Sequence, residues 1–213
     1  MSYTIDEFLT KYPDLACCKQ SILDAYDILL KSFQNGGKLL ICGNGGSCAD
    51  AEHIVGELMK GFKKRRPVSD DLKEKLCAIN PEKGALLANS LQGALPAIAL
   101  DGHQALNTAF INDVENGGEL SFAQQVMGYG NLNDVLLGIS TSGNAKNIYN
   151  AAIVAKAKGM KVIALTGKDG GKLKELADVS IIVPEKETFM IQERHLPIYH
   201  LLCLMLEDAF FNE

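Results

Sequence analysis

The sequence has no long apolar run, no excess of positive charge and no cysteine pairs at zinc-finger spacing. No apolar stretch reaches the length of a membrane span, so we expect no membrane partner. The net charge of −5 disfavours a nucleic-acid partner, although an anionic small molecule needs only local positive potential. The six cysteines are scattered, which predicts reduced, mostly buried thiols. Residues 1–7 lack the basic start and apolar stretch of a signal peptide, which predicts a cytoplasmic location.

The length and composition fit one globular domain spanning residues 1–213. The chain is 47% hydrophobic and 22% charged, which is ordinary for a protein with a sizeable core. Residues 1–36 are predicted to form an N-terminal helix, since apolar residues recur every three or four positions from Leu15 to Phe33. This stripe needs a partner, either the domain itself or a second subunit. We favour a second subunit, so we expect an oligomerisation helix.

Three similar units follow, each an apolar run, a turn of small residues and a helical pattern. The apolar runs and their turns are 38–42 with 43–47, 135–139 with 140–144, and 161–165 with 166–171. Further strands are predicted at 96–100 and 179–183. Strands that alternate with helices indicate an α/β fold with a parallel sheet covered on both faces. Ligands bind such sheets at the carboxyl ends of the strands, where these turns lie.

Two segments depart from this pattern. Residues 63–95 are predicted to form an inserted surface element, and they begin with the basic run Lys63-Lys64-Arg65-Arg66. We expect a solvated face for this run, with contact to an anion or a partner as the alternative. Residues 187–211 form a last helical pattern with Pro197 inside it, which predicts a kink or a helix that starts late.

The first two turns carry the features of an anion site. The turn 43–47 is rich in glycine, and Ser140, Thr141 and Ser142 supply three successive hydroxyls. A strand that leads into such a turn and then a helix aims backbone N–H groups at one point. The first turn is no dinucleotide fingerprint, because Cys48 stands where the third glycine would fall, and it lacks the lysine of a P-loop. The two turns together predict anion binding.

Acid–base groups follow the first turn. His53 and Glu57 are spaced i, i+4, on one face of the predicted helix. Such a pair is often only a solvated surface contact, and Gln192 and His200 are equally weak signals when each is taken alone.

Taken together, these motifs resemble the sugar isomerase (SIS) domain family and, within it, the phosphoheptose isomerases. The matching stretches are 42–47, 51–53 with Glu57, 134–144, 166–171, and 191–193 with His200. The resemblance implies a flavodoxin-like, three-layer αβα sandwich that assembles as a homotetramer. It also implies conversion of sedoheptulose 7-phosphate, a phosphorylated ketose, to D-glycero-D-manno-heptose 7-phosphate.

The resemblance also implies roles for individual residues. Glu57 matches the general base and His200 the general acid. One Zn²⁺ per subunit is implied, with ligands at His53, Glu57, Gln192 and His200. The implied substrate contacts are Asn44, Gly45, Ser47, Asp113, Ser140, Thr141, Ser142 and Gln192. The chemistry is consistent with these residue types, because isomerisation through an enediol needs a carboxylate base and a proton donor.

Two positions depart from the family pattern. Ala145 stands where a further serine of the phosphate loop is usual, and Phe189 stands where an aspartate near the sugar is expected. Two alternatives to an isomerase remain, a SIS protein that binds the bacterial replication initiator and a catalytically silent phosphosugar sensor. The presence of His53, Glu57, Gln192 and His200 together favours the enzyme.

Overall fold

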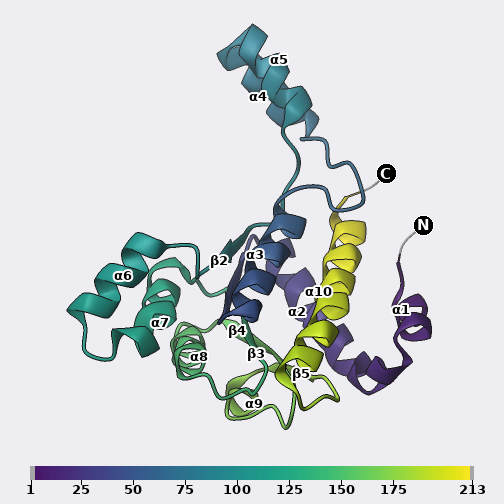
Figure 1. The fold of residues 1–213 in the computed structure, drawn as a ribbon. Helices are drawn as coiled ribbons and strands as arrows, with labels where there is room; N and C mark the ends of the chain where they lie inside the picture. The colour runs from purple at the N-terminus through teal and green to yellow at the C-terminus, as the bar shows by residue number, and fades with distance from the viewer. Residues whose placement is uncertain (1–2, 212–213) are drawn as a thin grey trace.

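A parallel five-stranded sheet forms the centre of the molecule (Figure 1). The computed structural model describes residues 3–211. The strand order is β2-β1-β3-β4-β5, and every neighbouring pair is parallel. The strands are β1 (Leu39–Gly43), β2 (Ala97–Ala99), β3 (Val135–Ser140), β4 (Lys161–Thr166) and β5 (Val179–Ile182). The prediction of a parallel α/β sheet is therefore confirmed, with each strand within one residue of its expected bounds.

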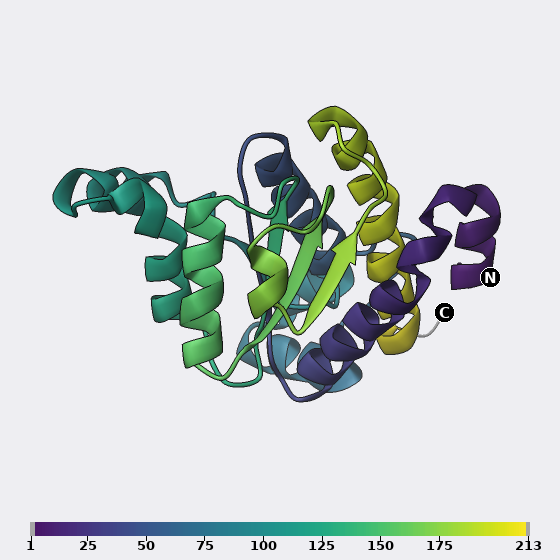
Figure 2. The ribbon, with the colours of Figure 1, turned by 90° about the horizontal axis from the view of Figure 1, so that it is seen from below.

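Helices cover both faces of the sheet (Figure 2). One layer contains α2 (Lys19–Gln34), α3 (Gly46–Met59) and α10 (Thr188–Phe210), and the other contains α7 (Gly117–Tyr129), α8 (Lys146–Ala157) and α9 (Leu173–Leu176). Side chains alternate along each strand, so Ile41 packs into the first layer and Leu40 into the second. This arrangement is the three-layer αβα sandwich that the resemblance implied.

The N-terminal segment is not one continuous helix. It consists of α1 (Ile5–Lys11), a 3-10 helix η1 (Pro13–Cys18) and then α2. The break falls at Tyr12, whose φ of −126° and ψ of 67° lie outside the helical region. The following Pro13 restricts the preceding residue in this way, so the single helix expected over residues 1–36 is divided.

The apolar stripe of this segment packs on its own domain. Leu15 and Ile22 are fully buried, and Leu29 and Phe33 join the same core cluster, which also contains side chains of α3 and α10. The chain itself therefore covers this stripe, which is the alternative to a second subunit, and a role of the segment in oligomerisation stays a prediction. Gly36, at φ +73°, ends the segment in the left-handed conformation that glycine tolerates.

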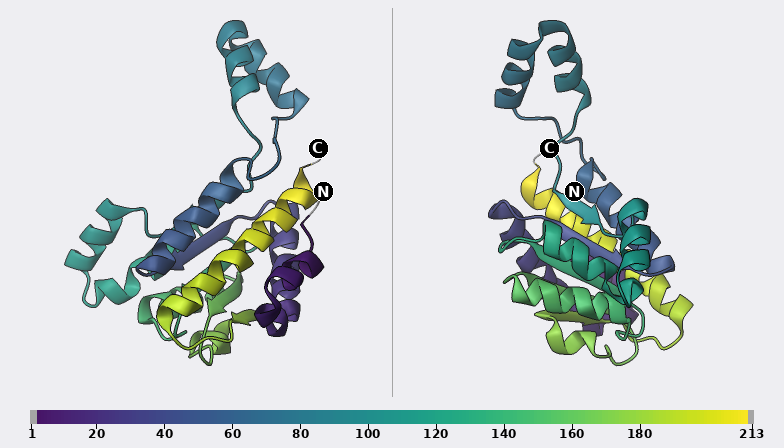
Figure 3. Two further views of the ribbon diagram at one scale, coloured as in Figure 1. Left: turned by 45° about the vertical axis from the view of Figure 1, so that its right-hand side comes forward. Right: turned by 90° about the vertical axis from the view of Figure 1, so that its left-hand side faces the viewer.

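A helical hairpin projects from the sandwich (Figure 3). It consists of α4 (Asp70–Ile79) and α5 (Pro81–Ser90), and Ile79 at its tip is 84% exposed. Residues 63–95 thus form the expected surface element, whereas their origin as an insertion stays a prediction. The basic run at their start differs from expectation, because Arg66 is 1% exposed and pairs with Glu207 at 2.8 Å. Arg66 is therefore the buried ion-pair partner of a carboxylate and does not belong to a solvated charged face.

The last helix, α10, runs from Thr188 to Phe210 with Pro197 inside it. Of the two expected outcomes, the late start is therefore wrong, and the kink at Pro197 stays a prediction. None of the helices among residues 3–211 has the length and apolar character needed to cross a bilayer.

His195 is a fully buried titratable group on α10. Burial lowers its pKa from 6.5 to about 4. The unfolded chain therefore binds a proton between pH 6.5 and 4 that the folded chain does not, so stability falls as the pH is lowered through this range. We expect the wild type to lose about 3 kcal/mol more than a His195→Gln variant between these pH values. Urea unfolding at several pH values measures this difference, and parallel stability curves would contradict the assignment.

Candidate functional site

The two predicted turns lie side by side at the carboxyl edge of the sheet. They follow β1 and β3, which are neighbours at the centre of the strand order. In the order 2-1-3-4-5 this is the switch point at which such folds bind ligands. Reciprocal hydrogen bonds between the side-chain amides of Asn44 and Asn147, at 2.9 and 3.0 Å, join the first turn to α8, the helix that follows the second turn.

The turn after β4, residues 166–171, packs against the turn after β3, residues 140–144. Gly143, at φ +66°, lies so close to Gly170 that a Cβ atom at residue 143 would overlap the Gly170 carbonyl. The Gly143 carbonyl also accepts a hydrogen bond from the backbone N–H of Leu173 at 3.0 Å. Only glycine fits this close approach at a positive φ, so the conformation of the hydroxyl-rich turn depends on it.

The hydroxyls of these turns lie at different depths. Ser47 in the first turn of α3 and Ser140 at the end of β3 are buried, and Thr141 and Ser142 are less so. Ser142 Oγ accepts a hydrogen bond from the backbone N–H of Asn144 at 3.2 Å, which leaves its own proton free to donate. Beside them, α3 starts from Gly45 at φ +58° with no side-chain cap, so its first N–H groups have no side-chain acceptor there.

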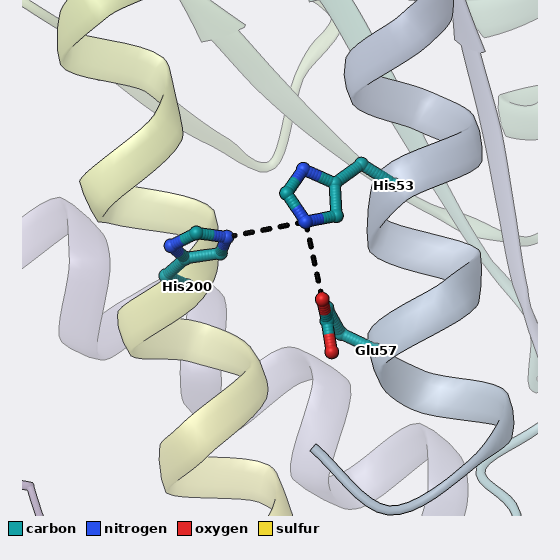
Figure 4. A group of neighbouring side chains, drawn as sticks. All are labelled: His53, Glu57 and His200. Atoms are coloured by element: carbon teal, nitrogen blue, oxygen red, sulfur yellow. Dashed lines mark hydrogen bonds and ion pairs between the residues drawn. The ribbon is translucent and has the colours of Figure 1, made fainter. Parts of the chain in front are cut away.

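Three acid–base side chains meet between α3 and α10 (Figure 4). His53 Nε2 lies 3.1 Å from Glu57 Oε1 and 3.5 Å from His200 Nε2. His53 and Glu57 meet because they are one turn apart on α3, as the spacing predicted. His200 joins them because α10 packs alongside α3, which brings together residues 147 positions apart in the sequence.

Burial and charge set the protonation of His200. Its pKa is lowered, first by desolvation and then by the neighbouring His53, while Glu57 opposes the shift. His200 is therefore a neutral imidazole at neutral pH, with one nitrogen that donates and one that accepts. Such a group is suited to passing a proton between two nearby oxygens.

Tyr199 contacts this cluster and Asp50 contacts Tyr199, and the sequence singled out neither residue. The Tyr199 hydroxyl lies 3.0 Å from His53 Nδ1 and donates to Asp50 Oδ1 at 3.1 Å. Burial raises the pKa of both Tyr199 and Asp50. The available signals were Asp50, three residues before His53 on α3, and Tyr199, next to His200 on α10. The pairing of Asp50 with Tyr199 depends on how the two helices pack.

A buried ion pair supports the end of α3. Arg66 donates from Nη2 to the Glu57 carbonyl at 3.0 Å and from Nη1 to the Leu58 carbonyl at 2.7 Å. Its partner Glu207, on α10, also accepts from the backbone N–H groups of Phe62 and Lys63, both at 2.9 Å. The arginine thus fixes the backbone that carries Glu57 against α10.

The donor set is consistent with a metal ion. One ligand atom each from His53, Glu57 and His200 lies within 4.8 Å of the others. Two imidazoles and a carboxylate form a set that zinc accepts, and three protein ligands leave a position for substrate or water.

Two predicted site residues do not join this cluster. The amide of Gln192 lies against Gly46, where an added Cβ would come within 2.5 Å of its nitrogen. Gln192 is eight residues before His200, about 12 Å along the helix axis. Asp113 ends α6 (Gln104–Asp113), which lies on the other side of α3 from α10 (Figure 1). The ligand role of Gln192 and the sugar contact of Asp113 therefore stay predictions.

Comparisons with known proteins show which family the chain belongs to. Models of the SIS domain match residues 92–206 and 15–76. The phosphoheptose isomerase of a Nitratiruptor species is 41% identical over 189 residues, which cover 89% of this chain and 86% of that protein. The chain belongs to the phosphoheptose isomerase group of the SIS domain family. The resemblance found in its motifs is thereby confirmed.

Solved structures show the same architecture. The phosphoheptose isomerase GmhA from Neisseria gonorrhoeae superposes with a TM-score of 0.70 at 32% identity, covering 96% of this chain and all of that one. A phosphoheptose isomerase from Francisella tularensis gives 0.72 at 32% identity, covering 97% and 99%. Family membership therefore extends over the whole fold that carries the turns and the cluster.

Proposed function

We propose that this protein is an aldose–ketose isomerase that converts sedoheptulose 7-phosphate to D-glycero-D-manno-heptose 7-phosphate. The observation that carries the proposal is the cluster of His53, Glu57 and His200 on the helix layer beside the hydroxyl-rich turns. Relatives named phosphoheptose isomerase, at about 40% identity over most of the chain, support the same reaction.

The reaction needs one base and one proton carrier. Glu57, whose side chain is 14% exposed, takes the proton from C1 of the ketose and returns it to C2. As the enediol forms, His200 donates a proton to O2, and it recovers one from O1 as the aldehyde appears. Each proton removed is thus replaced, and the substrate isomerises without gain or loss of atoms.

The turns orient the substrate. Ser47 is six residues before His53 on α3, so the phosphate site and the cluster are about 9 Å apart along the helix. This separation suits a sugar whose phosphate is several carbons from the reacting C1 and C2. Holding the distant phosphate in Ser47 and the 140–142 turn places those carbons at Glu57.

Zinc is part of the proposal. His53, Glu57 and His200 would hold one Zn²⁺. Gln192, the fourth ligand expected from the sequence, lies apart from these three within the chain, against Gly46. When bound, the ion would polarise the substrate oxygens and stabilise negative charge on the enediolate. Zinc content measured on the purified protein tests this part, and a His53→Ala variant is expected to lose the metal.

Reaction in D₂O tests the proton-transfer mechanism. Removal of the C1 proton by Glu57 allows exchange with solvent, so we expect deuterium at C2 of the aldose product. NMR of the product measures this incorporation. Complete retention of the original hydrogen, together with undiminished turnover in Glu57→Gln, would instead indicate a hydride shift and overturn the role of the base.

Ser142→Ala is expected to weaken substrate binding more than chemistry. Loss of one hydroxyl that donates to the phosphate should raise KM about tenfold and leave kcat within about twofold. Steady-state kinetics measure both constants, with Ser180→Ala on β5 as the control outside the turns. A fall in kcat at unchanged KM would contradict a phosphate contact.

The assembly and location belong to the proposal as well. We propose a homotetramer in the cytoplasm, with no nucleic-acid or membrane partner. Large exposed apolar side chains on the hairpin, such as Ile79 and Leu86, support association between subunits. Sedimentation of the purified protein measures the subunit number.

A further inference from the structure

A chain of hydrogen bonds leads from α3 across α10 and back into the cluster. Asp50 and His53 are one turn apart on α3, and the Tyr199 hydroxyl of α10 contacts both of them. Tyr199 is 2% exposed, and its ring stands nearly perpendicular to His53 and to His200, with ring-centroid distances of 5.5 and 5.0 Å. The phenol is therefore held in one place by packing as well as by hydrogen bonds.

The direction of these hydrogen bonds follows from the number of protons. A phenol has one proton, and a carboxylate oxygen only accepts, so Tyr199 donates to Asp50 Oδ1. The same hydroxyl can then only accept from His53. Nδ1 of His53 therefore carries a proton, and an imidazole ring with that single proton has its lone pair on Nε2.

The consequence concerns the centre of the cluster. His53 Nε2 faces Glu57 Oε1 at 3.1 Å and His200 Nε2 at 3.5 Å. A lone pair on Nε2 opposite a carboxylate oxygen is unfavourable unless something electron-poor lies between them. With Nδ1 protonated, the cluster presents converging acceptors to a cation or to the proton of a bound substrate.

We infer that Asp50 and Tyr199 are positioning residues that hold His53 as its Nδ1–H tautomer and aim the Nε2 lone pair into the cluster. Outer hydrogen-bond partners of this kind orient metal-binding histidines and raise their basicity. Asp50 Oδ2 is buried without a hydrogen-bond partner among residues 3–211, so Tyr199 is the side-chain contact that this carboxylate makes there. The effect on turnover rests on the proposed isomerase activity, whereas the tautomer of His53 does not.

The test breaks the chain of hydrogen bonds from Asp50 through Tyr199 to His53, here called the relay, at either end. In Tyr199→Phe the ring stays and the hydroxyl is lost, and in Asp50→Ala the acceptor for that hydroxyl is lost. Nitrogen-15 NMR of the metal-free full-length protein reports the His53 tautomer. We expect Nδ1–H in the wild type and a mixture of tautomers in both variants. Zinc affinity, measured by competition with a chelator, should fall at least about tenfold.

Matched variants separate positioning from a general loss of structure. Asp50→Asn keeps an acceptor oxygen and should retain the Nδ1–H form. Tyr129→Phe removes another tyrosine–histidine hydrogen bond, to His103 at 2.8 Å, and should change neither the His53 tautomer nor zinc affinity. In kinetics, Tyr199→Phe should lower kcat and leave KM for the phosphosugar within about twofold, because the turns are unchanged.

An unchanged His53 tautomer in Tyr199→Phe and Asp50→Ala would overturn the inference. Should Tyr199→Phe fail to fold, Asp50→Ala decides the question from the opposite end of the relay. The tautomer is measured without substrate, so a protein that lacked isomerase activity would still show whether the relay exists. Failure of the relay and failure of the proposed function therefore give different results.

Discussion

Glu57→Gln is expected to lower kcat about a thousandfold while the protein still binds the phosphosugar. The amide keeps the shape of the side chain but cannot take a proton from C1 of the substrate. The proposed phosphate contacts lie in the turns after β1 and β3, away from residue 57, so binding should persist. Rates are measured by following the aldose product, and binding by calorimetry.

Glu52→Gln is the matched control for this variant. Glu52 lies on the same helix, is exposed, and has no side-chain hydrogen bond among the described residues. It should retain wild-type kcat. A Glu57→Gln protein whose kcat stays within tenfold of the wild type would remove Glu57 from the role of general base.

Arg66→Met is expected to destabilise the fold by about 3–5 kcal/mol. Arg66 and Glu207 are 1% exposed, so removal of the arginine leaves a carboxylate buried without its charged partner. The Glu57 and Leu58 carbonyls each also lose the hydrogen bond that Arg66 donates to them. Urea or thermal unfolding measures the loss.

Two comparisons make this prediction specific. Arg65→Met removes an exposed arginine from the same basic run and should change stability by less than about 0.5 kcal/mol. The double variant Arg66→Met with Glu207→Gln should be more stable than Arg66→Met alone, because no unpaired charge remains buried. A loss below about 1 kcal/mol in Arg66→Met would show that water reaches Glu207.

The sheet could be predicted because each strand is an apolar run followed by small residues. Such runs are typical of parallel strands buried on both faces. Other elements carry weaker signals. No residue of α6 is buried, so its apolar side chains do not form a core-facing stripe, and α7 begins with two glycines. The division of the N-terminal segment follows from Pro13, because a proline can mark a break between helices as well as the start of one.

The site residues likewise divide into those that a local sequence pattern predicts and those that it does not. His53 and Glu57 were recognisable because their spacing is local to one helix. The burial of Arg66 depends on Glu207, which is 141 residues away, and the link from Asp50 to His53 depends on Tyr199 of another helix. Pairings of this kind follow from how α3 packs against α10, which no local pattern in the sequence determines.

The most direct measurement is an NMR assay of sedoheptulose 7-phosphate with the wild type and Glu57→Gln, with and without added zinc. We expect the wild type to form D-glycero-D-manno-heptose 7-phosphate, and Glu57→Gln to form almost none although it binds the ketose. Tight binding of the ketose by the wild type with no aldose formed, whether or not zinc is present, would contradict the proposed activity. The cluster would then belong to a binding protein rather than to an isomerase.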